Sequence, residues 1–217
     1  MLCQSLSDGK TGINVIDREI KNLYDSGYMH NHMRMYVASI ATNIAKSHWK
    51  QPAKWMYYHL LDGDWASNAL SWQWVAGSNS NKKYYANQEN INKYFNSTQK
   101  NSFLDCSYDH FQSMDIPEPL IKKINFNFEL NLPNEKEIKL DSTLPTLLFN
   151  YYNIDPNWRA NEKTNKLLIF EPELFKMYPV SKKCIDFCLE LAKNINDIQV
   201  FVGSFEDLHK NYPEMLF

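Results

Sequence analysis

Residues 59–77 read HLLDGDWASNALSWQWVAG and are the most informative stretch of the chain. Two acids flank a glycine at 62–64, Asn68 follows four residues later, and Trp72 and Trp74 form a Trp-x-Trp pair. In a helix, residues two apart point about 200° apart, so the two indoles are expected to face different surroundings.

Tryptophan is concentrated around this stretch, because five of the six tryptophans lie in the segment 49–74. A hydrophobic core does not need so many tryptophans, because each buried indole N–H must find a hydrogen-bond partner. Aromatic planes beside acids and amides suit a flat heterocycle with polar edges. A flavin is the first candidate ligand.

Composition sets the limits of the interpretation. A chain of 217 residues forms one large domain or two small ones, and 44% apolar residues are enough for a core. The net charge of −2 argues weakly against a protein coated with nucleic acid. No apolar run approaches the roughly 20 residues of a membrane span. The start MLCQSLSDGK also lacks the features of a signal peptide. The default expectation is a cytoplasmic protein.

The four cysteines do not predict a metal site. They include no CxxC pair, which makes a zinc site unlikely by spacing. Cys184 and Cys188 are four residues apart on an expected helix, which favours two small core residues over a disulfide.

The first half of the chain predicts helices. Apolar residues recur at helical spacing through 11–50, which indicates two helices, with Gly27 placed to end the first in a left-handed cap. Asn31 offers an amide N-cap for the second. A third helix is expected over 52–61, with Pro52 in its first turn, and a fourth over 67–75.

The pattern changes class along the second half. From residue 78 the chain is polar and is expected to be irregular, and prolines near 117 mark a boundary between domains 1–116 and 117–217. Beyond it, INFNFELNL at 124–132 alternates as a half-buried strand does. A strand, an amphipathic helix and a strand then follow at 166–172, 180–195 and 198–205, which predicts a βαβ unit with parallel strands.

The segment from Asp8 to about Gly77 resembles the flavin-binding domain of the photolyase/cryptochrome family. DGKTGINVIDREIKNLYDSGYMHNHMRM is similar to its GKTG…TG(Y/W)MHNRxRM segment, and residues 59–77 are similar to its DGDxAxN…WQW segment. The resemblance implies a mainly α fold, with part of a multi-helical photolyase-type FAD-binding domain in 1–116 and a small α/β region of unknown role in 117–217. It also implies that the chain starts within the flavin domain. The antenna domain and the first half of the flavin domain would then be absent, so that the chain would be a fragment, half of a split gene or a remnant. In the second case, a separate N-terminal photolyase polypeptide is an expected partner.

The resemblance implies a set of residues around FAD. Arg34 and Asp62 would form an ion pair over the flavin ring. A planar guanidinium suits this place because it can both pair with a carboxylate and lie against an aromatic ring. Asp64, after Gly63, would accept from the isoalloxazine or ribityl edge. Two amides would also contact the cofactor. Asn31 would lie at the adenine end or on the substrate side, and Asn68 would face flavin N5.

The resemblance also implies residues for electrons and substrate. Trp72 and Trp49 match two inner members of the chain that photoreduces the flavin. Trp74 matches a residue that packs against a flipped-out pyrimidine dimer, and Met35 matches the enzymes that split cyclobutane dimers. Asn31 also matches the enzymes that split cyclobutane dimers. His32 stands where the family usually has an Arg, and this replacement would weaken phosphate binding.

Three functions are consistent with these residues. The first is a photolyase-like flavoprotein, or its catalytic half, in which light-driven electron transfer from FAD repairs cyclobutane pyrimidine dimers in DNA. The second is a cryptochrome-like blue-light receptor without repair. The third is a remnant that binds no flavin. Two departures from the family, Ala69-Leu70-Ser71 before Trp72 and YYANQENINKY at 84–94, indicate a divergent branch.

Overall fold

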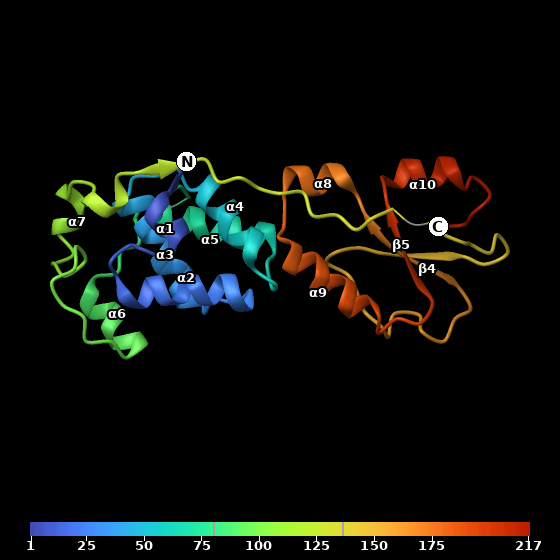
Figure 1. Ribbon diagram of the computed structural model, residues 1–217, viewed down its shortest axis with the longest axis horizontal. Coiled ribbons are helices and arrows are strands. Elements are labelled where there is room, and N and C mark those ends of the chain that lie inside the picture. The colour runs from blue at the N-terminus through green and yellow to red at the C-terminus, as the bar shows by residue number, and fades with distance from the viewer. Residues whose placement is uncertain (80, 136) are drawn as a thin grey trace. The chain divides into compact units, whose positions relative to one another are not determined.

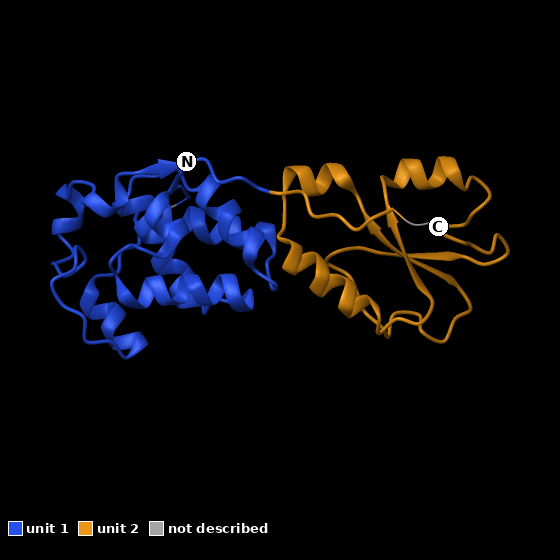
Figure 2. Ribbon diagram, viewed as in Figure 1, with its two compact units in different colours: residues 1–128 blue, residues 129–217 orange. Residues whose placement is uncertain are grey.

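A short antiparallel pair brings together the two ends of the helical part of the chain. β1 (Leu2–Cys3) pairs with β2 (Lys123–Ile124), with Leu2 opposite Ile124. The computed structural model describes residues 1–79, 81–135 and 137–217, and these divide into unit 1, Met1–Phe128, and unit 2, Glu129–Phe217 (Figures 1 and 2). Unit 1 thus ends at Phe128, whereas the sequence placed a domain boundary after residue 116.

Unit 1 is helical, as the sequence predicts. Its helices are α1 (Gln4–Asp8), α2 (Asn14–Ser26), α3 (Asn31–Ser39), the π-helix η1 (Ile40–Ile44), α4 (Lys50–His59), α5 (Trp65–Ala76), α6 (Gln88–Phe95), α7 (His110–Ser113) and the 3-10 helix η2 (Glu118–Leu120). α5 packs against both α3 and α4, so the helix that carries the Trp-x-Trp pair lies between the other two.

Helix ends test the capping expectations. Gly27 ends α2 in the left-handed region at φ 73°, and its N–H donates to Leu23 O, which confirms the predicted cap. The prediction of Asn31 as the N-cap of α3 is wrong. The helix begins at Asn31, and the cap is His30, whose Nδ1 accepts from His32 N at 3.2 Å. An imidazole nitrogen here does the work expected of an amide.

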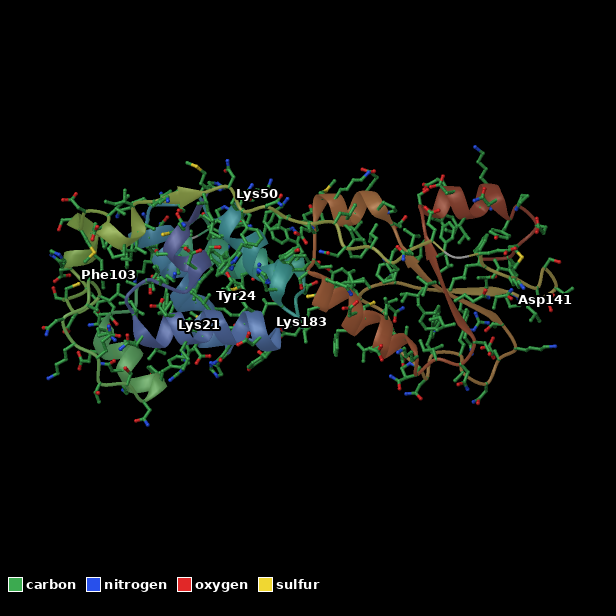
Figure 3. All side chains as sticks on the ribbon, viewed as in Figure 1. Lys21, Tyr24, Lys50, Phe103, Asp141 and Lys183 are labelled. Atoms are coloured by element: carbon green, nitrogen blue, oxygen red, sulfur yellow. The ribbon has the colours of Figure 1, made fainter. Side chains whose placement is uncertain are left out.

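Tyr24 shows how unit 1 satisfies a buried indole. The Nε1–H of fully buried Trp55 donates to Tyr24 Oη at 3.0 Å, and Tyr24 O–H donates to Ser7 O at 2.5 Å. Figure 3 shows Tyr24 among the helices of unit 1. Because its polar atom is paired, Trp55 can serve as a core residue.

Two sequence expectations in unit 1 are wrong. The alternating segment 124–132 forms ladder pairs only at its first residue, and Phe126 and Phe128 instead pack edge-on against Tyr58, at 5.8 and 5.6 Å between centroids. Period-two alternation predicts one buried face, and here α4 contacts Phe126 and Phe128 of that face in place of a strand. The polar stretch after residue 78 contains α6, capped by Asn87.

Unit 2 contains a three-stranded parallel sheet. β3 (Thr146–Phe149), β4 (Asn165–Phe170) and β5 (Ile198–Val202) lie in the order β3-β4-β5. Its helices are α8 (Pro172–Met177), α9 (Lys182–Ala192) and α10 (Phe205–Asn211). β4, α9 and β5 form the predicted βαβ unit with parallel strands. Cys184 and Cys188 are both buried, as expected of core residues. Within the described ranges, no helix is both long and apolar enough to cross a membrane.

Candidate functional site

A cavity of about 90 Å³ lies between α3, the turn at 62–64 and α5. Eight of the eleven residues singled out in the sequence line it: Asn31, Arg34, Met35, Asp62, Gly63, Asp64, Asn68 and Trp72. They come from two segments 27 or more positions apart, and the packing of α5 on α3 brings them together. The other three, His32, Trp49 and Trp74, are not among the lining residues of this cavity.

Arg34 is held from three sides. Its Nε donates to Met29 O at 2.7 Å, and its Nη2 donates to both carboxylate oxygens of Asp62 at 2.9 and 2.8 Å. Its guanidinium carbon also lies 5.8 Å from the centroid of the Tyr28 ring. Because Nε and Nη2 are engaged, the Nη1 group is the part of the fork that stays available to a ligand.

The turn at 62–64 sets the start of α5. Asp64 caps the helix, since its Oδ1 accepts from Ser67 N at 2.7 Å. A carboxylate has further lone pairs, so the cap does not use up its acceptor capacity. Close packing favours Gly63, because a Cβ there would lie 3.1 Å from Leu60 O and 3.2 Å from a ring carbon of Tyr57.

Asn68 and Trp72 lie one turn apart on the face of α5 that lines the cavity. Nδ2 of Asn68 donates to Ala53 O at 2.9 Å, which orients the amide and leaves Oδ1 as an acceptor. Trp72 is buried, with 1% of its surface exposed, whereas Trp74 is 48% exposed. The two indoles therefore face different surroundings, as the helical spacing predicts.

The three remaining residues lie in other aromatic contacts. Trp49 is half-buried just before α4, with its ring 5.6 Å from that of His48. His32 stacks on Tyr36 at 5.8 Å and 10°, and Trp74 packs on Tyr84 at 5.6 Å.

The sequence interpretation missed part of the lining. Ser67, Ser71 and Val75 line the cavity together with Ala38 and Leu60. The first three follow each other at intervals of four along α5, on the same face as Asn68 and Trp72. That spacing was readable from the sequence, although nothing in it distinguished these small residues from a solvated face.

The polar groups that line the cavity fit part of a flavin. A guanidinium, an amide oxygen and two carboxylates meet an apolar wall, which suits the edge of a flat heterocycle with polar atoms. A volume of about 90 Å³ is small beside the roughly 300–1,000 Å³ of a typical ligand pocket. A cavity of this size has room for only one portion of a dinucleotide-sized cofactor. Among the described residues, no group of three His, Cys, Asp or Glu side chains is placed to hold a metal ion.

Comparison with known protein families also points to a flavin-binding domain. The family described as the FAD binding domain of DNA photolyase matches residues 2–113, about half of the chain. The chain belongs to this family. The match covers nearly all of unit 1, including every lining residue of the cavity. The fold is accordingly that of a mainly α photolyase FAD-binding domain with an additional α/β unit.

Several curated relatives are deoxyribodipyrimidine photo-lyases. The one from Agrobacterium fabrum is 44% identical over 70 residues, which cover 32% of this chain and 15% of the relative. The one from Vibrio cholerae is 36% identical over 78 residues, or 36% and 17% of the two chains. The one from Buchnera aphidicola is 28% identical over 163 residues, or 75% and 31%. The chain thus matches less than a third of the length of each relative.

Proposed function

We propose that this photolyase-family domain binds FAD and takes part in the light-driven repair of cyclobutane pyrimidine dimers in DNA. The observation that carries the proposal is the single cavity lined by Arg34, Asp62, Asn68 and Trp72. It joins a fixed cation, an oriented amide acceptor and a buried indole, and each of these suits one requirement of flavin photochemistry.

The residues divide into three roles. Arg34, Asp62, Gly63, Asp64 and Asn68 contact the flavin, with Asn31 at the adenine end or on the substrate side. The fork of Arg34 is already oriented by Met29 O and by Asp62, so little side-chain freedom is lost on binding. Asn68 offers its Oδ1 to flavin N5, since its Nδ2 is held by Ala53 O. When bound, FAD supplies the light-excited electron donor.

The electron and substrate roles are divided among residues inside and outside the cavity. Trp72 relays electrons from inside the cavity, with Trp49 as the next member of the chain. Trp74 and Met35 contact the extruded dimer, together with Asn31 and His32. The exposed indole of Trp74 offers a stacking face for an extruded base.

The test is to titrate the full chain with FAD and to record the visible spectrum in darkness and under blue light. This is done alone and with a separately expressed photolyase N-terminal half, the protein partner that we propose. Trp72→Phe should leave the flavin bands and slow their bleaching. Trp55→Phe is the matched control, because Trp55 is equally buried but lies outside the cavity lining.

The outcomes separate three functions. Bleaching together with restored thymines in an irradiated oligonucleotide supports repair. Bleaching without repair points to the cryptochrome-like receptor. A chain that gains no flavin bands in either arm contradicts the proposal and leaves the non-binding remnant.

A further inference from the structure

Five aromatic rings form a continuous row in unit 1, next to the cavity in sequence and in space. The row starts at Tyr94 in α6, passes through His32 and Tyr36 in α3 and through Tyr84, and ends at Trp74 in α5. Successive ring centroids are 5.0, 5.8, 6.5 and 5.6 Å apart. We call these five residues the aromatic row.

The row is anchored in its middle and open at both ends. Tyr36 is buried, and its O–H donates to Asn90 Oδ1 at 2.6 Å, which ties α3 to α6. Its ring is nearly parallel to those of His32 and Tyr84, at 10° and 6°. By contrast, Tyr94 is 54% and Trp74 is 48% exposed. Large aromatic rings held at the surface by a packed interior suit recognition of a partner better than they suit the core.

The segment that carries Tyr84 and Tyr94 has a net positive charge. The segment 82–95 carries Lys82, Lys83 and Lys93 against a single acid, Glu89. The ammonium of Lys93 lies 5.6 Å from the centroid of the Tyr94 ring, in cation–π contact. Exposed aromatic rings interleaved with lysines are typical of surfaces that bind single-stranded nucleic acid.

The row also continues the proposed substrate site. Asn31 and Met35 line the cavity and are sequence neighbours of His32 and Tyr36 on α3. A strand whose dimer packs on Trp74 would therefore have neighbouring nucleotides within the reach of the other rings. A base inside a duplex has both faces covered by its neighbours. Only an unpaired base can offer a free face to such a ring.

We propose that the aromatic row binds unpaired DNA next to the dimer, with Tyr94 and His32 stacking on a flanking nucleobase and the three lysines contacting phosphates. The proposal rests on the proposed repair function and adds that the preferred substrate is single-stranded or locally opened DNA. It assigns specificity to segment 82–95, where the sequence departs from the family.

The experiment measures the fluorescence anisotropy of a labelled oligothymidine and of a labelled hairpin duplex of equal charge, with the full chain and no FAD. Tyr94→Ala should weaken oligothymidine binding about 5- to 150-fold, the loss expected for one stacked base. Tyr94→Phe should restore it. Tyr152→Ala in unit 2 is the matched control, because Tyr152 is also 54% exposed and should leave binding unchanged.

Several results would overturn the proposal. One is undetectable oligothymidine binding by the wild-type chain, and another is equal affinity for the hairpin duplex. A third is Tyr94→Ala binding like the wild type, which would mean that the row is covered by protein or contributes charge alone. Since FAD is absent throughout, failure of flavin binding would not imitate any of these results.

Discussion

Replacing Arg34 by Lys separates two interactions that its guanidinium makes. The bond from Nε to Met29 O, at 2.7 Å, joins a charged donor to the carbonyl of a fully buried residue. Such a bond contributes about 1.5–3 kcal/mol to stability. The ion pair with Asp62 is shorter than 3 Å but more exposed, because 55% of the Asp62 side chain is open to solvent. Exposed pairs contribute only about 0.2–1 kcal/mol.

We therefore expect Arg34→Lys to lower the free energy of unfolding by about 1.5–3 kcal/mol, since Lys has a single nitrogen and loses the bond to Met29. Asp62→Asn should cost less than about 1 kcal/mol. Urea unfolding followed by tryptophan fluorescence measures both, because five of the six tryptophans lie in unit 1. The double variant gives the coupling energy. A coupling above about 2 kcal/mol, or an Asp62→Asn loss equal to that of Arg34→Lys, would refute the reasoning.

Two further predictions concern stability. Gly27→Ala should lower the free energy of unfolding by about 2–4 kcal/mol, because its φ is 73° and the new Cβ would lie 2.5 Å from Leu61 Cγ. Gly12→Ala, at φ 84° with open space around it, should show only the backbone part. Burial raises the pKa of the Cys188 thiol to about 12, whereas the pKa of a thiol in the unfolded chain is about 8.5. The unfolded chain loses that proton first, so the free energy of unfolding should fall by about 1.5 kcal/mol from about pH 8.5 to about pH 10. Cys188→Ala should remove that part of the fall. Both predictions are measured by urea titration.

Specific results would contradict these expectations. Equal losses for the two glycine variants would show that contact with Leu61 contributes nothing. Identical pH slopes for wild type and Cys188→Ala would show that the buried thiol does not keep its proton as described.

Local features of the sequence predicted most of the helices, and the resemblance to the photolyase/cryptochrome family implied most of the residues that line the cavity. The helical period predicted that Trp72 and Trp74 face different surroundings, and the Asp-Gly-Asp turn is a local signal. Asparagine-rich composition concealed α6, whose ends are marked by Asn87 as N-cap and by Asn96 in the left-handed region, at φ 48°. These cues are weaker than a hydrophobic stripe because asparagine is equally frequent in turns.

The sequence by itself determined the family, the helical first unit, the βαβ unit and eight residues that meet in one cavity. Only the tertiary structure decided what covers Phe126 and Phe128, because an alternating pattern predicts that a face is buried but not by which element. It likewise decided that His32 and Trp74 belong to a row of rings that crosses α3, α5 and α6. Contacts between residues about 50 positions apart depend on how helices pack, and no local signal in the chain encodes them.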